Sequence, residues 1–174
     1  MIKDNVAKAI SDQINAEYYS AYLYMYLSSV ADDMGYTGIQ NWLRVQAKEE
    51  MAHATHMYEH LLERDGDIDF GPIASPKDDV DYHDVRKIFE KVLEHEKLVT
   101  QLIDNIATLA MQEGDHATYT FFTWYVNEQV EEVDTASNLL KKVKLIEHNP
   151  GQLYDLDTDL ATRVFVDPFA GGAA

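Results

Sequence analysis

A carboxylate and an imidazole stand three residues apart, at Glu50 and His53, in a stretch without glycine or proline that runs from Arg44 to Met57. On an α-helix, positions i and i+3 share a face, so both side chains can reach one point in space. Divalent transition metals accept both kinds of ligand atom. The pair alone is a weak signal, because such pairs arise by chance on charged helices. Its weight depends on what other helices carry at the same depth.

Four long segments with apolar residues at alternating steps of three and four predict helices over about residues 4–33, 38–65, 83–113 and 115–147. Gly35 and Gly66 are predicted to stop the first two helices, and Thr37 with Gln40 predicts a capping box at the start of the second. In each segment these residues form a stripe along one helix face. The stripe of the fourth segment consists of Thr118, Phe122, Tyr125, Gln129, Glu132, Ala136, Leu139, Val143 and Ile146.

The connection over residues 66–82 contains two glycines and two prolines and has no helical period. A loop this long is explained if it crosses the length of a bundle and lets the second and third helices point the same way. Asn149-Pro150-Gly151 is predicted to break the fourth helix, and a short fifth helix is predicted over 153–164. We therefore expect an all-α fold, a four-helix bundle with a long crossover and a short C-terminal helix. It forms one domain over residues 1–165, followed by a flexible tail over 166–174.

Each of the four stripes is apolar at nearly every position and polar near its middle. The polar residues at these points are Glu17 on the first stripe, Glu50 and His53 on the second, Glu96 on the third, and Gln129 and Glu132 on the fourth. Glu94 lies off the third stripe, so Glu96 is the better candidate. A single acid on a buried stripe is more often a protonated core residue than a ligand. Acids on all four stripes at comparable depth are much harder to obtain by accident, and they predict a metal site.

Charge balance indicates how many metal ions such a layer would hold. Buried carboxylates without partners cost several kcal/mol each, or take up protons. No Lys or Arg lies on the four stripes near this layer, so ordinary salt bridges on the stripes cannot neutralise it. Two divalent cations would balance the four carboxylates. Glutamate and histidine ligands suit Fe(II), Mn(II) or Zn(II).

Further residues near the layer have both functional and purely structural interpretations. Tyr24 lies two turns from Glu17 on the same stripe, and it could hydrogen-bond a ligand, lose an electron, or simply pack in the core. Glu49, Glu128 and Glu131 flank the stripes, and they would form either a third cation site or a solvated acidic face.

Composition limits the possible functions. The 174 residues are 46% hydrophobic, and 14 basic against 31 acidic residues give a net charge of −17, which argues against nucleic acid as a partner. The absence of cysteine excludes disulfides and thiolate metal sites. No apolar run approaches the length of a membrane span, and the first residues do not resemble a signal peptide. We therefore expect a cytoplasmic protein without a membrane partner.

Four stretches carry a resemblance to a known family: NAEYYSAYLY around Glu17, WLRVQAKEEMAH around Glu50, HEKLVTQ around Glu96 and FFTWYVNEQVEEV around Gln129. Over about residues 1–165 the chain resembles bacterial and archaeal non-haem ferritins of the ferritin-like di-iron superfamily. The resemblance implies iron storage and detoxification by a ferroxidase that oxidises Fe(II) with O2 or H2O2. It also implies deposition of ferric mineral in a hollow homo-oligomeric cage, usually of twenty-four subunits.

The resemblance assigns roles to individual residues. It implies two irons per subunit, the first bound by Glu17, Glu50 and His53. The second would be held by Glu96 and Glu132, with Glu50 as the bridge and Gln129 close by. A possible third iron would take Glu49, Glu128 and Glu131, and Tyr24 matches the family's nearby tyrosine. The segment after Gly151 resembles the short helix that lines a symmetry channel, although DLDTDLATRVFVDPF is the least family-like part.

Three alternatives stay open. Met51 stands where haem-containing bacterioferritins have their haem-ligating methionine, but a second Glu-x-x-His is replaced here by Gln129-x-x-Glu132, so no haem is expected. A di-iron oxidase or peroxidase of the erythrin type would need a substrate pocket beside the irons and no cage. An interaction module could carry the acidic layer as a vestige.

Overall fold

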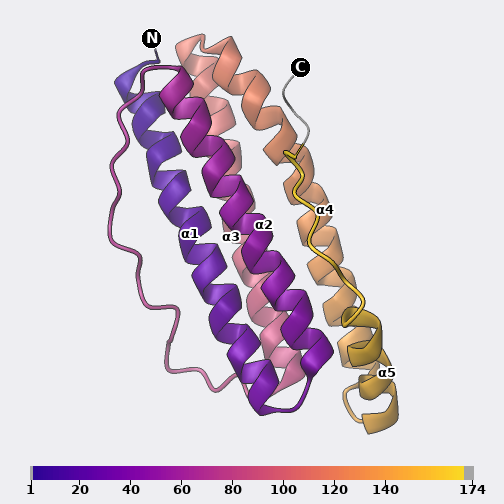
Figure 1. The fold of residues 1–174 in the computed structure, drawn as a ribbon. Helices are drawn as coiled ribbons and strands as arrows, with labels where there is room; N and C mark the ends of the chain where they lie inside the picture. Colours follow the sequence, from indigo (N-terminus) through magenta and orange to yellow (C-terminus); the bar gives the residue numbers. More distant parts are fainter. Residues whose placement is uncertain (1, 171–174) are drawn as a thin grey trace.

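The computed structural model describes residues 2–170 and consists of five α-helices and connecting segments, with no strand in that range. The helices are α1 (Asp4–Asp33), α2 (Thr37–Glu63), α3 (Val85–Glu113), α4 (His116–Ile146) and α5 (Pro150–Leu160). The first four run side by side as a bundle, and α5 lies at one end (Figure 1). The predicted all-α class and the four-helix bundle with a short fifth helix are confirmed.

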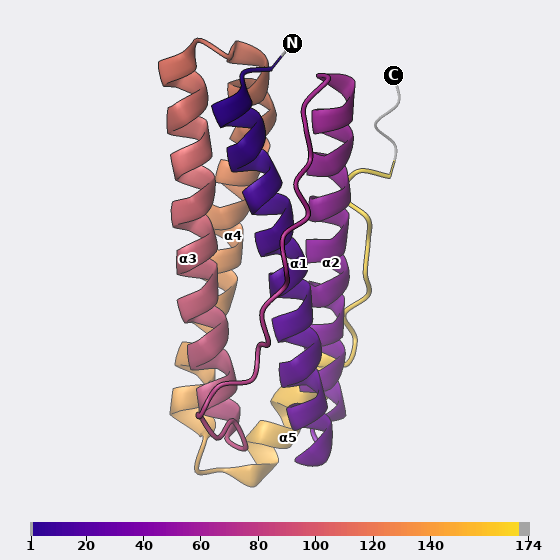
Figure 2. The same cartoon turned by 90° about the vertical axis from the view of Figure 1, so that its left-hand side faces the viewer.

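The connection between α2 and α3 runs the length of the bundle along the outside of α1, so α2 and α3 point the same way (Figure 2). Asp69 fastens its first half to α1. The backbone N–H of Asp69 donates to the Ser11 hydroxyl at 2.7 Å, and the Asn15 amide donates to the Asp69 carbonyl at 3.0 Å. The predicted crossover is therefore present, and it brings the middles of α2 and α3 to comparable depth.

Helix α2 begins differently from the sequence prediction. The predicted capping box is wrong, because Thr37 is the first helical residue and its N-cap, Tyr36, makes no side-chain cap bond. The buried Asp157 of α5 instead accepts a hydrogen bond from the Ile39 backbone N–H at 2.8 Å. A tertiary partner thus satisfies one of the donors that every helix N-terminus leaves free. At its other end α2 stops at Glu63, two residues earlier than predicted.

Helix α5 starts three residues earlier than predicted and is shorter. Helix α4 ends at Ile146, before the predicted break at Asn149-Pro150-Gly151. Pro150 occupies the first turn of α5, where its fixed φ is compatible with a helix and its missing N–H costs nothing. The side chain of Asn149 caps the helix by accepting from the Gln152 N–H. The helix ends at Leu160, so the predicted extension to Val164 is wrong.

The stripes predicted to be buried form two apolar clusters, one on each side of the mid-length polar layer. Leu27, Leu43 and Phe89 belong to one cluster, and Ile10 and Met57 to the other. In the fourth stripe, Leu139 and Ile146 are only half-buried, while Leu140, which was not predicted, is buried. Steps of three and four residues both stay on one helix face, so the pattern alone does not separate these two leucines.

None of the helices among residues 2–170 is long and apolar enough to span a membrane. The flexibility expected for residues 166–174 stays a prediction for the first five, and residues 171–174 lie outside the described part.

The contact between α5 and the first turn of α2 yields a prediction. A Cβ atom on Gly38 would lie 1.6 Å from the backbone oxygen of Asp157. We expect Gly38→Ala to push α5 away and to lower the free energy of unfolding by about 1–3 kcal/mol, as overpacking does elsewhere. Gly151→Ala is the control, because its Cβ would meet only Asn149 Oδ1 at 3.5 Å. Equal urea or thermal midpoints for the two variants would contradict the expectation.

Candidate metal centre

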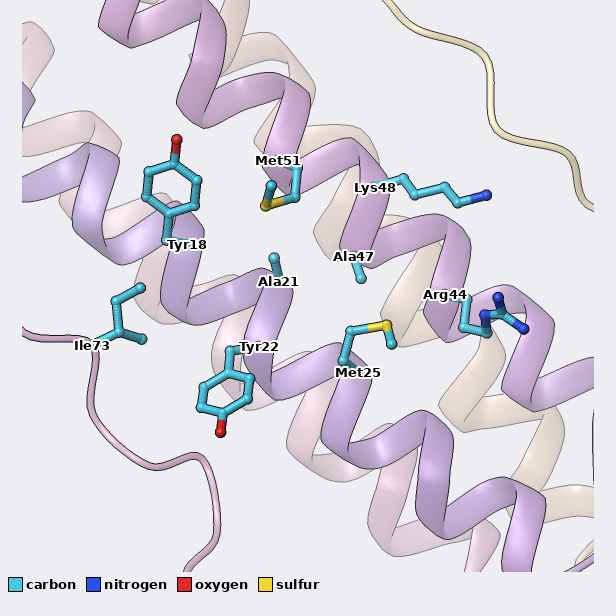
Figure 3. Close-up of a pocket in the computed structure, with 9 residues that line it drawn as sticks. All are labelled: Tyr18, Ala21, Tyr22, Met25, Arg44, Ala47, Lys48, Met51 and Ile73. Atoms are coloured by element: carbon cyan, nitrogen blue, oxygen red, sulfur yellow. The ribbon is translucent and has the colours of Figure 1, made fainter.

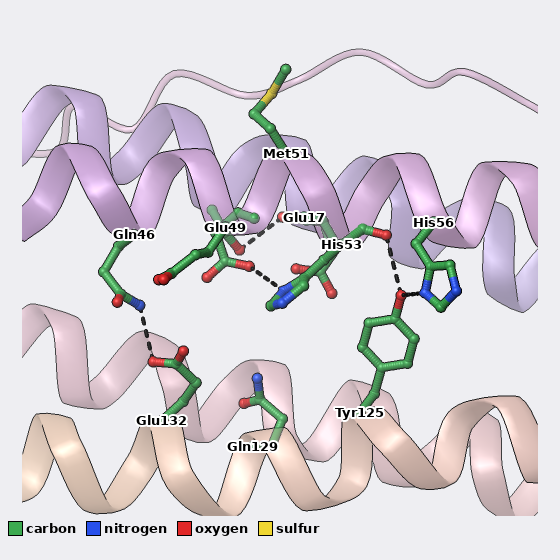
Figure 4. Close-up of polar contacts among 12 residues, drawn as sticks. Glu17, Gln46, Glu49, Met51, His53, His56, Tyr125, Gln129 and Glu132 are labelled. Carbon is green, nitrogen blue, oxygen red and sulfur yellow. Dashed lines mark hydrogen bonds and ion pairs between the residues drawn. The ribbon is translucent and has the colours of Figure 1, made fainter. Parts of the chain in front are cut away.

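The polar residues predicted at mid-length do lie in the interior of the bundle. Each of the four long helices contributes: Glu17 from α1, Glu50 and His53 from α2, Glu96 from α3, and Gln129 and Glu132 from α4, all of them buried. Figure 4 shows members from α1, α2 and α4 facing one another across the space between the helices. Glu94, by contrast, is exposed and pairs with Lys91.

Three of these side chains form a compact set. Glu17, Glu50 and His53 each offer a ligand atom within 4.8 Å of the others, and within residues 2–170 no other group of three or more such side chains meets this criterion. The Nδ1 atom of His53 lies 3.2 Å from a Glu50 oxygen. Gln13, one turn before Glu17, donates to the Glu17 carboxylate at 2.8 Å. The sequence analysis missed Gln13, although its i, i+4 spacing from Glu17 was visible.

The other predicted ligands lie in the same layer but are held by polar neighbours. The Tyr24 hydroxyl donates to a Glu96 oxygen. The Gln46 amide donates to Glu132 at 2.9 Å. Gln129 accepts from the Thr100 hydroxyl at 3.1 Å. Glu96, Gln129 and Glu132 therefore lie beside the compact set but do not converge on the same point as its three members.

The electrostatics of the layer favour a bound cation. Burial, reinforced by the Glu50 charge, raises the pKa of Glu17 well above its ordinary value. Burial and the neighbouring Glu132 raise the pKa of Glu96 to about 8. One oxygen of each of these two residues, Glu17 Oε2 and Glu96 Oε2, has no hydrogen-bond partner in the described structure. Buried acceptors without donors fit a divalent cation with oxygen and imidazole ligands.

Aromatic rings cover the His53 side of the layer. Trp124 meets the His53 ring edge-on, with centroids 5.6 Å apart. The Tyr125 hydroxyl lies 2.8 Å from His56 Nδ1, and the Phe169 ring stacks on His56 at 3.8 Å. Phe169 belongs to the segment after α5, so part of the predicted tail packs against α2 and α4.

The three acids of the possible third site differ in exposure. Glu49 and Glu128 are partly buried, and Glu131 is exposed. The pKa of Glu49 is raised, mainly by burial, while Arg163 opposes the rise. Arg163 forms an ion pair with Glu49 at 2.7 Å and also donates to Gln46. The sequence analysis missed Arg163, because it lies outside the four stripes and more than a hundred positions away from its partners.

Met51 points to the opposite side of α2 from this layer (Figure 4). Figure 3 shows it in a surface groove between α1 and α2, where Met25 and Tyr22 also lie. The groove has a volume of about 550 Å³ and is completed by Ile73 of the crossover. Met51 is thus no part of the candidate metal centre.

A long four-helix bundle with carboxylates and an imidazole directed into its core defines the class of bundle proteins that can hold metal ions between facing helices. Residues 7–146 match the family model described as a ferritin-like domain. The chain belongs to the ferritin family.

Relatives support this assignment along nearly the whole chain. A bacterial non-heme ferritin of Staphylococcus aureus is 32% identical over 165 residues, which cover 95% of this chain and 98% of the relative. A probable bacterial non-heme ferritin-like protein of Haemophilus influenzae is 33% identical over 160 residues, with 92% and 96% covered.

Solved structures of archaeal ferritins have the same fold. An open-pore ferritin from Archaeoglobus fulgidus is 40% identical and superimposes with a TM-score of 0.88, covering 94% of this chain and all of the other. A humanized archaeal ferritin is 42% identical with a TM-score of 0.91, covering 95% and 99%.

The raised carboxyl pKa values predict how stability depends on pH when metals are removed. The pKa of Glu96 is about 8 in the folded protein against 4.5 ordinarily. Between these values the folded state binds more protons than the unfolded state, so its stability falls as pH rises. In chelator, we expect the melting temperature to decline across this window. Glu96→Gln should flatten the decline, while the exposed Glu94→Gln on the same helix should not. Equal slopes for both variants would contradict the expectation.

Proposed function

We propose that the buried layer oxidises Fe(II) to Fe(III) and that the protein stores the product as ferric mineral. Membership of the ferritin family supports a role in iron storage. The observation that carries the ferroxidase proposal is the convergence of Glu17, Glu50 and His53 beside carboxylate oxygens that lack hydrogen-bond donors. The negative charge of these carboxylates balances the positive charge of a cation that enters the bundle.

The proposed roles follow the positions of the side chains. Glu17, Glu50 and His53 bind the first Fe(II), and Glu50 also faces the second. Glu96 and Glu132 bind the second Fe(II), with Gln129 beside them. Because burial raises the pKa values of these carboxyl groups, iron must displace protons, and binding therefore releases them. O2 or H2O2 takes the electrons from the two bound Fe(II) substrate ions.

Two hydrogen bonds orient the proposed ligands of the second iron. Tyr24 donates to Glu96, and Gln46 donates to Glu132. Each bond engages one oxygen of its carboxylate, and Glu96 Oε2 has no hydrogen-bond partner, so a metal ion can bind the other oxygens while both donors stay in place. Tyr24 stays next to the site afterwards, which supports the proposed place of this tyrosine beside the irons.

Storage requires an enclosed space, and we propose that the chain assembles as a cage of twenty-four copies, as the family resemblance implies. Glu49, Glu128 and Glu131 form a third iron site in this proposal. The cytoplasmic location and the single domain over residues 1–165 stay predictions from the sequence.

Two measurements separate this proposal from its alternatives. Light scattering on the purified particle distinguishes a twenty-four-subunit cage from the dimer that an erythrin-type oxidase or peroxidase would form. The visible absorption spectrum distinguishes a haem protein, because haem bound at Met51 would give a Soret band. We expect a large particle without that band. A dimer, or one haem per two chains, would overturn the storage proposal in its non-haem form.

Glu50 is the ligand that the proposal depends on most, because it is shared between the two irons. We expect Glu50→Ala to slow initial Fe(II) oxidation by more than the roughly 10- to 100-fold typical of residues outside the first coordination shell. The bundle should still fold, since the substitution removes one buried repulsive charge. The exposed Glu63→Ala on the same helix serves as control. Stopped-flow absorbance measures the rate, and a wild-type rate in Glu50→Ala would refute the site.

A further inference from the structure

The segment after α5 brings one basic side chain to the edge of the candidate metal centre. Arg163 Nη2 lies 2.7 Å from Glu49 Oε2, and Nη1 donates to Gln46 Oε1. The guanidinium carbon stands 5.0 Å from the centre of the Trp42 ring. The side chains of Arg163 and Glu49 are only 27% and 19% exposed. Arg163 is therefore partly shielded from solvent and has two polar partners.

The backbone around Arg163 is held in place as well. The Asn41 amide of α2 donates to the carbonyl oxygen of Arg163 at 2.9 Å and to those of Leu160 and Ala161 at 3.3 Å. One turn earlier, Asp157 accepts from Ile39. The start of α2 thus fixes the chain just before the arginine, which limits where its side chain can reach. In Figure 2 the segment after α5 runs alongside α2.

Arg163 connects two parts of the metal centre. It contacts Glu49 of the third acidic set directly. Through Gln46, whose amide donates to Glu132 at 2.9 Å, it also reaches a ligand of the second iron. Its charge acts further, because burial and Glu132 raise the pKa of Glu128 while Arg163 opposes the rise.

We propose that Arg163 is a tethered cation that competes with iron for Glu49 and, through Gln46, helps to hold Glu132. This role rests on the proposed function of the layer. A guanidinium keeps its charge at all physiological pH values and binds with a planar fork of donors, so it cannot vacate Glu49 by losing a proton. A metal ion that takes Glu49 must displace it. Occupation of the third site therefore releases Arg163 from Trp42 and Gln46.

Zinc titration by calorimetry tests the competition without redox chemistry, since Zn(II) is not oxidised. The zinc-binding event that is lost in the Glu128→Gln variant is assigned to the third site. We expect Arg163→Gln to tighten that event by roughly fivefold, because a partly shielded ion pair contributes on the order of 1 kcal/mol. Arg163→Lys should restore most of the wild-type affinity. Lys48→Gln is the matched control, because it removes an equal charge from an exposed position beside Glu49.

Trp42 reports the displacement directly. In a Trp124→Phe background it is the only tryptophan, and it is 4% exposed beneath the guanidinium. We expect the third zinc equivalent to shift Trp42 emission to longer wavelength, and we expect no such step when Arg163→Gln is added. A purely structural role for Arg163 would loosen the segment but would not tighten zinc binding.

The outcomes separate this inference from the proposed function. Unchanged third-site affinity in Arg163→Gln, with the two tighter sites still sensitive to Glu50→Ala, would overturn the role of Arg163 alone. If Glu50→Ala left the zinc affinity of the two tighter sites unchanged, the di-iron proposal would be overturned as well.

Discussion

The burial of four carboxyl groups at one depth is the constraint that shapes this protein. Burial without compensation costs several kcal/mol per charge. The structure places apolar clusters above and below the layer, so water cannot supply that compensation from either end. Gln13, Tyr24 and Gln46 donate hydrogen bonds instead. These donors leave two buried oxygens without partners, and that deficit is the reason to expect cations there.

The long crossover is the topological condition for this layer. A short loop between α2 and α3 would make them antiparallel, as it does for α1 with α2 and α3 with α4. The crossover along α1 lets both α2 and α3 start from the same end of the bundle (Figure 2). Glu50 and Glu96 are fourteen and twelve residues from the starts of their helices, counted from Thr37 and Val85 inclusive. At 1.5 Å per residue, they therefore stand within about 3 Å of the same depth.

Local periodicity was enough to predict the layer, and long-range contacts explain what it missed. Glu17, Glu50, His53 and Glu96 fall on buried stripes because side chains three and four positions apart share a helix face. The capping of the α2 N-terminus could not be predicted in this way, since Asp157, which accepts from its Ile39 N–H, comes from α5. Arg163 was missed for the same reason, being brought to Glu49 by the packing of α5 on α2. Pattern reasoning finds what one helix encodes, but not what a distant segment supplies.

The acidic side chains are neutralised in two ways, by Arg163 near the surface and by protons or metal ions in the interior. This difference bears on function. Glu17 and Glu96 are almost completely buried, so a permanent cation placed beside them would lose nearly all its hydration. Glu49 retains 19% exposure at its side chain, where a guanidinium can keep part of its contact with water and stack on Trp42. A permanent cation is therefore tolerated beside the partly exposed Glu49 but not beside the buried Glu17 and Glu96. The interior acids are left to charges that come and go, protons or metal ions, which is what an oxidation site for a transient substrate requires.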